Sequence, residues 1–591
     1  MKSPIPNPKS AAPQALPSAS RQLHSAGLPP LLLRHFDQIA AAPDAIPRLR
    51  QFILDLAVRG KLVLQDPKDE PASVLLIRIR QEIARLAQAG ERCKERAIPA
   101  VEPDEVPFLP PSGWEWVRTR HVTLDRGQTV PTQDFTYIDV TAINKEVGIV
   151  ADTKVLSASE APSRARKLVQ PGDVIYSCVR PYLLNIAVIP EGIAPSPIAS
   201  TAFAVLNGLG LVLPRYLWIV LRSPFMVECV QEKMRGQAYP AINDSDFALL
   251  PFPLPPLAEQ HRIVAKVDEL MALCDRLEAA QAERETRRTR LVASTHASLS
   301  APTDSTLHTP RPTFFIHHLP VLTSHPTDIP QLRQTILNLA VCGKLVPQDP
   351  KDEPASEALA KAAVQNLKAG TSKTGRDWVS ESKARPPAGF TPPSGWVWTQ
   401  IGSTVERVTV GYVGPMKDQY VERGIPFLRS QNVRANRFRP EGLINISPQF
   451  HRSILKSALV PGDVVVVRSG NVGTACSIPS SLPEANCSDL VVVKRPSAVL
   501  PDYLCFYLNS LAVVHIEQGT VGVALTHFNT KSVAIMPLPL PPLAEQHRIV
   551  AKVDELMVLC DRLEAQLNTS QTHSCRLLES TLHQALAARS R

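Results

Sequence analysis

Two long stretches of this 591-residue sequence occur twice, almost letter for letter. Residues 253–279, PLPPLAEQHRIVAKVDELMALCDRLEA, return as residues 539–565 with one change in 27 positions. Residues 52–73 return as residues 335–356 with four changes in 22 positions. The offsets, 539 − 253 = 286 and 335 − 52 = 283 residues, indicate two consecutive copies of one unit. Solenoid repeats span only about 20–45 residues, so this period argues against a solenoid.

A third landmark, PPSGWEW at residues 110–116, returns as PPSGWVW at residues 392–398. Between the landmarks the similarity nearly vanishes, because residues 117–252 and 399–538 share little beyond a PGDV tetrapeptide. The frame is therefore duplicated, whereas its two inserts are not. This pattern predicts one scaffold that holds two independently diversified modules.

The duplicated frame has helical periodicity. Apolar residues in 49–56 fall at i, i+3, i+4 and i+7, and a second apolar series over 76–86 follows a Pro/Asp-rich stop. After each PLPP, apolar residues recur at alternating three- and four-residue steps, the seam of a coiled coil. We expect the seams of the two copies to pack against each other. They consist of Ile263, Val267, Leu270, Cys274 and Leu277, and of Ile549, Val553, Leu556, Cys560, Leu563 and Leu567.

The inserts have the pattern of short strands. Runs such as DVIYSC (173–178), DVVVVR (463–468) and DLVVVK (489–494) lie between Gly, Pro and Asn stops. Each insert is expected to form a compact α+β module. The first 40 residues, rich in Pro, Ala and Ser, are expected to be a disordered leader.

Composition excludes several classes of protein. No apolar run approaches the roughly 18 residues of a membrane span, and the N-terminus has no hydrophobic signal region. Ten Cys form neither a CxxC pair nor a Cys/His metal spacing, so we expect a protein of the reducing cytoplasm. The formal charge, 64 − 55 = +9, suits a polyanionic partner.

The common catalytic motifs are missing. The sequence has no phosphate-binding GxxxxGK[ST], no GxGxxG after a strand, no HExxH and no Asn/Asp-Pro-Pro-aromatic tetrapeptide. The repeated EQHR (259–262 and 545–548) is interpreted as a polar face that binds a partner. The repeated KDE (68–70 and 351–353) is interpreted as a turn cap. We therefore expect no active site.

A basic segment of the second insert is a candidate for nucleic-acid contact. Residues 423–439 carry five Arg, two Phe and a Gln-Asn pair. Arg reads guanine, Asn or Gln reads adenine, and neighbouring Arg neutralises phosphates. A solvated basic face is the alternative. The candidates are Arg429, Gln431, Asn432, Arg434, Arg437 and Arg439, with Arg468 and Asn471 after the PGDV strand and His527 and Asn529 before PLPP.

The first insert has a weaker set of candidates, because its corresponding stretch, residues 135–145, is not basic. An Arg that ends a buried strand before a turn is nevertheless well placed for a phosphate or base contact. The candidates from these three places are Tyr137, Thr141, Asn144 and Lys145, then Arg180, Tyr182 and Asn185, and finally Gln237, Tyr239 and Asn243.

Four sequence blocks resemble the specificity subunits of Type I restriction–modification systems. They are PLPPLAEQHRIVAKVDELM in both copies, LAVRGKLVLQDPKDEPAS with its second copy, GWEWV with GWVW, and VVVVRSGNVGTA. The resemblance extends from about residue 46 to the C-terminus. It implies an α+β fold with an internal pseudo-two-fold, in which two long antiparallel coiled-coil helices separate two α/β target-recognition domains.

This resemblance divides the chain into seven segments. They are a leader (1–45), a helical frame (46–109), target-recognition domain 1 (110–256), a central long helix (257–300), a linker with the second helical frame (301–391), target-recognition domain 2 (392–542) and a distal long helix (543–591).

The resemblance also implies a function. The chain would be a non-catalytic subunit that reads a bipartite site in double-stranded DNA, one half-site per domain. It would hold two methyltransferase (modification) subunits, and two restriction/translocase subunits would join them. We expect this chain to bind no cofactor or metal, whereas S-adenosylmethionine, ATP and Mg²⁺ are expected on the partners. Two alternatives stay open: the specificity subunit of a smaller system with one combined methyltransferase/nuclease partner, and a free-standing DNA-binding scaffold.

Overall fold

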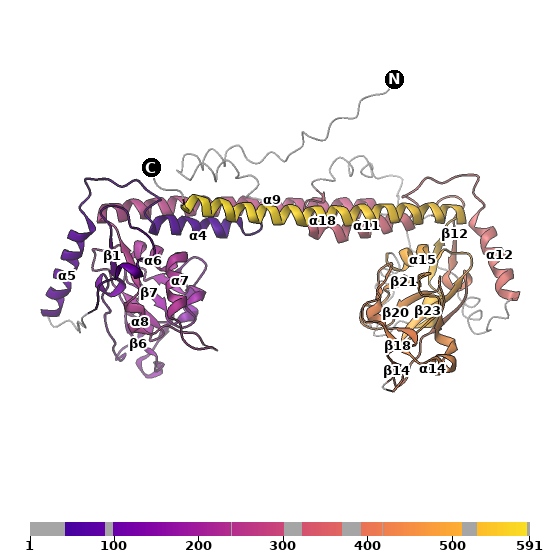
Figure 1. Ribbon diagram of the computed structural model, residues 1–591, viewed down its shortest axis with the longest axis horizontal. Helices are drawn as coiled ribbons and strands as arrows, with labels where there is room; N and C mark the ends of the chain where they lie inside the picture. Colours follow the sequence, from indigo (N-terminus) through magenta and orange to yellow (C-terminus); the bar gives the residue numbers. More distant parts are fainter. Residues whose placement is uncertain are drawn as a thin grey trace, which may run out of the picture. The chain divides into compact units, whose positions relative to one another are not determined.

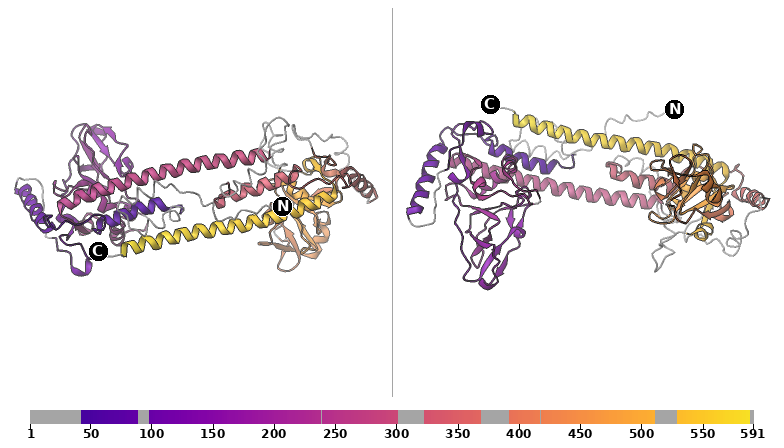
Figure 2. Two further views of the ribbon diagram at one scale, coloured as in Figure 1. Left: turned by 90° about the horizontal axis from the view of Figure 1, so that it is seen from above. Right: turned by 60° about the horizontal axis from the view of Figure 1, so that its bottom comes forward.

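The computed structural model describes residues 42–88, 98–237, 239–300, 322–368, 392–416, 418–510 and 529–587. The chain forms two compact units, of which unit 1 comprises residues 1–283 and 571–591 and unit 2 comprises residues 284–570. Figures 1 and 2 show the elements of each unit. In the described ranges, no helix combines the length and apolar character that crossing a membrane requires.

Both units contain parts of two long helices. Helix α9 (Leu257–Ser300) contributes residues 257–283 to unit 1 and residues 284–300 to unit 2. Helix α18 (Leu543–Ala587) contributes residues 543–570 to unit 2 and its remainder to unit 1. Each is one uninterrupted helix (Figure 2). Each compact unit is therefore completed by the end of the other copy's long helix.

The repeated helices form the same frame in each unit. In unit 1, α4 (Ala45–Val58) and α5 (Ala72–Gln88) accompany α9, and Arg50 of α4 pairs with Asp275 and Glu278 of α9 at 2.7 and 2.8 Å. In unit 2, α11 (Ile329–Val341) and α12 (Ala355–Lys368) accompany α18. There Arg333 repeats the pattern with Asp561 and Glu564, at 2.7 and 2.9 Å. The predicted helices over 49–56 and 76–86 lie within α4 and α5.

The prediction that the two apolar seams bury each other is wrong, because they lie in two separate hydrophobic clusters. In unit 1, Ile263, Val267, Leu270 and Cys274 are buried in one cluster with α4, and Leu277 packs at its edge together with Leu582 and Leu586 from the end of α18. In unit 2, Ile549, Val553 and Cys560 are buried in a separate cluster with α11, and Leu556, Leu563 and Leu567 pack at its edge. An a/d pattern shows that a helix has one apolar stripe, but it does not indicate which element covers that stripe. The stripe of α9 is covered by α4 and the end of α18, and the stripe of α18 is covered by α11.

The first module contains two main sheets. Its helices are α6 (Pro214–Arg222), α7 (Pro224–Lys233) and α8 (Asp244–Ala248). One sheet has the order β5-β2-β9-β6 and the other β10-β7-β8-β4-β3, and β1 pairs with β11 where the chain enters and leaves the module. The strands are β1 (Glu115–Arg118), β2 (Phe135–Ile138), β3 (Ile143–Asn144), β4 (Ile149–Val150), β5 (Lys154–Leu156), β6 (Ala165–Leu168), β7 (Val174–Ser177), β8 (Ile186–Val188), β9 (Pro197–Ser200), β10 (Phe203–Leu206) and β11 (Pro251–Leu254).

The second module also has two main sheets, ordered β14-β18-β15-β22-β19 and β13-β23-β20-β21, with β12 paired to β24 at its base. Its helices are α14 (Pro448–Ser453), α15 (Pro501–Leu508) and α17 (Thr530–Ala534). The strands are β12 (Val397–Gln400), β13 (Val405–Val410), β14 (Tyr420–Val421), β15 (Ile425–Leu428), β16 (Val433–Arg434), β17 (Arg437–Phe438), β18 (Ile444–Ile446), β19 (Ala458–Leu459), β20 (Val464–Val467), β21 (Ala475–Ser477), β22 (Ala485–Cys487), β23 (Leu490–Pro496) and β24 (Pro537–Leu540).

The two modules share the arrangement of their central strands although their sequences share little. They differ at the hairpins, since β3–β4 extends a five-stranded sheet through the β4–β8 pair whereas β16–β17 forms a separate two-stranded sheet. In module 1, β2 lies between parallel β9 and antiparallel β5, and β7 between antiparallel β8 and β10. In module 2, β15 lies between parallel β22 and antiparallel β18, and β20 between antiparallel β21 and β23. Mixed helices and strands agree with the predicted α+β class. Since most strand pairs are antiparallel, α/β is the wrong description of each module.

The PGDV tetrapeptide builds the same buried turn in both modules. Asp173 is fully buried, and its carboxylate accepts hydrogen bonds from the Arg126 side chain at 2.6 Å and the Asn207 side chain at 2.9 Å. Asp463 is also fully buried and accepts from Lys494 Nζ at 2.8 Å and the Arg495 backbone N–H at 3.0 Å. A buried carboxylate needs such partners, which explains why this turn survives in otherwise dissimilar modules.

Candidate nucleic-acid interface

The three repeated landmarks meet in one joint that attaches module 1 to its long helix. Trp114 of the PPSGW motif donates its indole N–H to Glu259 Oε2 at 2.9 Å, and Gln65 Nε2 donates to Glu259 Oε1 at 3.2 Å. Arg262 holds Asp69 through two hydrogen bonds of 2.5 and 3.3 Å. Strand β1 follows Trp114 directly, so this network links the base of the module to α9.

The second copy repeats the joint atom for atom. Trp396 donates to Glu545 at 3.0 Å, Gln348 donates to the same carboxylate at 3.1 Å, and Arg548 holds Asp352 at 2.6 and 3.3 Å. The interpretation of KDE as a turn cap is therefore wrong for its central Asp, which is an ion-pair partner of the long helix.

The interpretation of EQHR as a partner-binding face is wrong for its first two residues. Glu259 and Gln260 are 1% and 0% exposed, and Gln260 Oε1 accepts the Leu213 backbone N–H at 3.0 Å. Glu545 and Gln546 are buried to the same extent, and Gln546 Oε1 accepts from the Leu500 backbone at 2.7 Å. Burial raises the pKa of the Glu259 and Glu545 carboxyls, against the lowering effect of their hydrogen bonds. The joint is structural, and its buried acids serve no reaction that the structure indicates.

A glycine is required where the frame meets the PPSGW motif. Gly60 has a φ of +64°, and a Cβ there would lie 2.2 Å from Pro111 Cγ. Gly343 has a φ of +68°, and a Cβ would lie 2.3 Å from Pro393 Cγ. The repeated Gly-Lys dipeptide therefore allows the close approach that closes each joint.

The first module carries a hairpin, β3–β4, directly after β2. Asn144 and Lys145 are exposed, and Asn144 Oδ1 accepts the backbone N–H of Glu146 at 3.1 Å, which closes the turn. Thr141 is exposed, and its hydroxyl donates to Asp139 Oδ1 at 2.6 Å. Tyr137 is 9% exposed and lies in a hydrophobic cluster of β2, which argues against its predicted DNA contact. All four residues of β2 are buried, because this strand lies between β5 and β9, and the sequence of so short a run does not show that it is an interior strand.

A second exposed group surrounds the turn after β7. The Arg180 guanidinium lies over the Tyr239 ring at 4.7 Å, and the Arg180 backbone N–H donates to the Pro240 carbonyl at 2.8 Å. Tyr182 and Tyr239 are 43% and 70% exposed. The structure therefore brings together two candidate loops that are far apart in the sequence. Arg235, which the sequence did not single out, is exposed, forms an antiparallel backbone bridge with Ala241 and pairs with Asp246 at 3.2 Å.

The remaining candidates of module 1 have different surroundings. Asn185 is 8% exposed, which argues against a base contact. Asn243 is exposed but caps α8, because its Oδ1 accepts the Asp246 backbone N–H at 2.7 Å. Gln237 is exposed.

The second module places a basic hairpin, β16–β17, at the position of β3–β4. Arg434 and Arg437 are directly paired across it, and both side chains are exposed. Among the described residues, neither makes an ion pair with a carboxylate, whereas Arg439 Nε lies 3.2 Å from Glu441 Oε2. Like charges opposite each other destabilise a hairpin. Their presence favours an external anion as partner.

Two side chains beside this hairpin are held in place. Arg429 Nη2 and Gln431 Nε2 both donate to the Gly442 carbonyl at 3.1 Å. Asn432 is fully buried and donates to the Arg439 and Glu441 carbonyls, so its prediction as a DNA contact is wrong. Its amide closes the loop that displays its neighbours.

The last candidates lie near the PGDV strand and the second PLPP. Arg468 pairs with Asp489, and Asn471 is exposed in the following turn. Asn529 caps α17 by accepting the Ser532 backbone N–H at 2.8 Å, as Asn243 caps α8. His527 lies outside the described residues.

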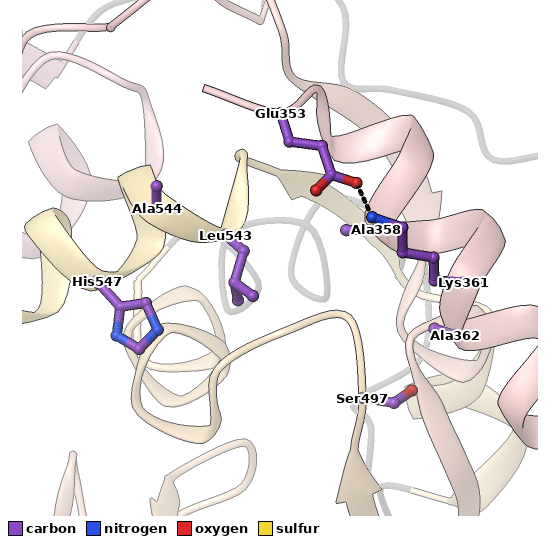
Figure 3. Close-up of a pocket in the computed structure, with 8 residues that line it drawn as sticks. All are labelled: Glu353, Ala358, Lys361, Ala362, Ser497, Leu543, Ala544 and His547. Atoms are coloured by element: carbon purple, nitrogen blue, oxygen red, sulfur yellow. Dashed lines mark hydrogen bonds and ion pairs between the residues drawn. The ribbon is translucent and has the colours of Figure 1, made fainter. Parts of the chain in front are cut away.

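Unit 2 also contains a cavity of about 490 Å³ (Figure 3). It is lined by Glu353, Ala358, Lys361, Ala362, Ser497, Leu543, Ala544 and His547, with the Glu353–Lys361 ion pair beside it. At the corresponding positions of copy one, Leu75 and Ile79 are buried, whereas copy two has Ala358 and Ala362. The smaller side chains leave this space. In the described ranges, no group of three or more metal-ligating side chains is present.

Comparisons with known proteins agree with this two-copy architecture. A family model described as "Type I restriction modification DNA specificity domain" matches residues 167–285 and 409–570, one segment in each copy. The chain is 30% identical over 567 residues to the Type I restriction enzyme EcoAI specificity subunit of Escherichia coli, covering 92% of this chain and 94% of that protein. This chain belongs to the family of Type I specificity subunits.

A second relative points to the same family, and one solved structure is similar in sequence. The EcoEI specificity subunit of Escherichia coli is 28% identical to this specificity subunit over 572 residues, covering 92% of this chain and 94% of that protein. The solved structure of the HsdS subunit from Thermoanaerobacter tengcongensis is 26% identical and covers 82% of this chain and 98% of that one, with a TM-score of 0.46. The family confirms the predicted role in DNA recognition as a non-catalytic subunit.

Proposed function

We propose that this specificity subunit reads a bipartite site in double-stranded DNA, with one half-site contacted by each module. The observation that carries the proposal is the pair of hairpins. They follow equivalent strands, β2 and β15, yet β16–β17 displays Arg434 and Arg437 whereas β3–β4 displays Asn144 and Lys145. Equal placement lets both hairpins reach the DNA, where exposed Arg holds phosphates. The polar side chains at and beside the hairpins, such as Asn144 in module 1 and Gln431 in module 2, then supply the base contacts of each module.

The duplicated frame is proposed to hold two modification subunits. The joint explains why buried residues of the frame are identical in the two copies, but exposed residues of the frame are identical as well. His261 and Glu269 of α9 are exposed, and so are His547 and Glu555 of α18 at the same positions of the repeat. Glu269 and Glu555 pair with Lys266 and Lys552 of their own helices at 2.9 and 2.8 Å, but such exposed pairs contribute little to stability, so contacts within the chain do not account for the identity. A partner that binds the same surface twice does.

The chemistry is proposed to belong to those partners. S-adenosylmethionine is expected on the modification subunits, and ATP with Mg²⁺ on the restriction subunits that complete the complex. A system whose single partner both methylates and cleaves would use the same frame and modules.

Methylome sequencing tests the proposal. Cells that express this chain with its modification subunits should methylate one site made of two half-sites and a spacer, and cells without the chain should not. Equal methylation without the chain would contradict the proposal, and DNA binding without any partner-dependent methylation would favour the free-standing scaffold.

A module exchange makes the test sharper. The β1–β11 ladder pairs Arg118 with Pro251, and the β12–β24 ladder pairs Gln400 with Pro537, so these pairs are equivalent junctions. Replacing residues 401–536 by residues 119–250 should yield a chain that recognises the first half-site twice. Retention of the second half-site would contradict the assignment of one half-site to each module.

A further inference from the structure

The two hairpins are fastened by the same helix position in both modules. Helices α6 and α15 start with equivalent prolines, Pro214 and Pro501, and lie at the same place in the topology. Counting from these prolines, Arg222 ends α6 and Asn509 follows α15 at the same step, 222 − 214 = 509 − 501 = 8. A sequence comparison would not score Arg and Asn as similar, yet each side chain forms hydrogen bonds to the hairpin of its own module.

In module 1, Arg222 ties the hairpin to the turn after β7. Its Nη1 donates to the Lys145 carbonyl at 2.8 Å and to the Leu184 carbonyl at 3.3 Å, and its Nη2 lies 3.3 Å from the Glu146 carbonyl. Leu184 ends the short helix η6 (Pro181–Leu183), which contains Tyr182 and follows Arg180. One guanidinium thus holds two of the candidate DNA-contacting loops together.

The hairpin also rests on Trp218 of α6. Arg222 and Arg215 lie on this ring at 4.9 and 3.9 Å, and a Cβ on Gly148 of the hairpin would lie 2.4 Å from Trp218 Nε1. Burial lowers the pKa of Arg222 to about 10, so its guanidinium still carries its charge at neutral pH. Arg215 binds Asp268 of α9 instead of the hairpin, at 2.8 Å.

In module 2, Asn509 makes the equivalent link through its amide. Its Nδ2 donates to Asn436 Oδ1 in the hairpin turn at 2.6 Å and to the Ala475 carbonyl at 2.8 Å. Its Oδ1 accepts the Ala475 backbone N–H at 3.0 Å. Ala475 begins β21, directly after the turn that contains Arg468 and Asn471. Here too, one side chain at the helix end binds both the hairpin and the start of β21, next to a direct bond from the Asn436 backbone N–H to the Ala475 carbonyl at 2.9 Å.

We propose that Arg222 and Asn509 are positioning residues for DNA recognition, each of which fixes the hairpin of its module against the neighbouring turn so that both contact one half-site together. This inference rests on the proposed function. A base contact discriminates only when the side chain is held in the correct place, because a mobile loop adapts to the wrong base as well. Each residue should therefore determine the discrimination at one half-site without touching DNA.

Substitutions at the two helix ends test the inference in the complex of the full chain with its modification subunits. Arg222→Gln replaces the guanidinium of module 1 by a shorter amide, and Asn509→Ala removes the amide of module 2. Asn436→Gly keeps the positive φ of +60° that this turn needs and removes only the acceptor of Asn509. Methylation rates are measured on duplexes that carry single-base changes in either half-site.

We expect Arg222→Gln to reduce discrimination at the first half-site by about tenfold, which is within the range of one lost base contact, and to leave the second half-site unchanged. Asn509→Ala and Asn436→Gly should do the same at the second half-site only. The double variant Asn509→Ala/Asn436→Gly should be no worse than Asn509→Ala alone, because Asn509→Ala already removes the contact to Asn436.

Two controls separate positioning from plain stability. Arg215→Gln removes the other guanidinium on Trp218, and Ser510→Ala removes the hydroxyl beside Asn509, which donates to the Tyr507 carbonyl at 3.0 Å. Neither should alter discrimination at equal melting temperature. Unchanged discrimination in Arg222→Gln and Asn509→Ala would overturn the inference and leave the proposed function intact, and so would an equal loss at both half-sites. Wild-type methylation that does not depend on this chain would instead overturn the proposed function.

Discussion

The paired arginines of β16–β17 should weaken folding while they strengthen DNA binding. Arg434 and Arg437 face each other across the hairpin, exposed and without a carboxylate ion-pair partner among the described residues. Opposed like charges cost about 0.2–1 kcal/mol in a strand pair. The variant Arg434→Gln/Arg437→Gln should therefore be more stable, with a melting temperature higher by about 1 °C for a unit of this size.

The same variant should bind DNA with a weaker salt dependence. Each phosphate contact contributes a slope of about 0.9 in log K against log salt. Between about 50 and 200 mM salt, log salt rises by about 0.6, so each contact accounts for a factor of about 3.5 and two contacts for about 12. The wild-type complex should lose about 12-fold more affinity than the variant over this interval.

Fluorescence anisotropy with specific and random duplexes measures both quantities. The single variants should each reduce the slope by about 0.9, and both duplexes should be affected equally because phosphates carry no sequence information. Arg452→Gln, which removes one exposed charge from α14 of the same module, is the matched control for net charge. A double variant with the wild-type slope would refute the assignment of this pair to phosphates. A variant that is less stable would refute the repulsion on which the expectation rests.

Three further predictions concern recognition, packing and pH. Gln431→Ala, which loses an exposed amide held on Gly442, should weaken discrimination at the second half-site by ~1–3 kcal/mol, and methylation of single-base variants measures it. Ala362→Ile should stabilise unit 2 by about 1 kcal/mol, since three buried carbons contribute ~2.4 kcal/mol and rotamer entropy and helix propensity offset roughly half of it. The reverse change, Ile79→Ala, should destabilise unit 1 by about 2–5 kcal/mol in thermal unfolding, and a costless Ile79→Ala would contradict the account of the cavity. Because burial raises the pKa of Glu259 and Glu545, the stabilisation that their protonation provides is present below the ordinary pKa of 4.5 and is lost as the pH rises through the raised values. Denaturant unfolding of Glu259→Gln/Glu545→Gln should therefore depend less on pH in that window than the wild type, and identical pH profiles would contradict it.

The helices of the frame could be predicted from the sequence, but their partners could not. The apolar periodicity of residues 49–56 lies in α4, and the long series after each PLPP lies in α9 and α18. The stripe of α9 is covered by α4 and by the end of α18, as Leu582 and Leu586 show. Periodicity reports the buried face of a helix and contains no information on which element covers it.

The sequence indicated which loops carry exposed polar side chains, but it did not show which of the candidate residues are buried. Exposed residues such as Arg434 and Tyr239 stand where a DNA contact is possible, whereas Tyr137 and Asn432 are buried. Tyr137 belongs to an interior strand that is buried on both faces, and Asn432 turns inward to bind the Arg439 and Glu441 carbonyls, and neither environment can be read from so short a segment. The pairing of Arg180 with Tyr239 depends on two loops nearly 60 residues apart, 239 − 180 = 59, which no local pattern indicates.

The sequence comparison did not show that the two modules are structurally equivalent, and there is a physical reason for this. A strand ladder is held by backbone groups, so β2 and β15 adopt the same place with different side chains. Positions that must bind a backbone carbonyl are similarly tolerant, because a guanidinium in Arg222 and an amide in Asn509 both donate to one. The joint allows no such exchange, since Glu259 must accept from the Trp114 indole in a buried place of fixed size. Near-verbatim repetition of the frame and divergence of the modules therefore follow from the kind of group that each contact needs, and a chain built in this way can change what a module recognises without disturbing how it is attached.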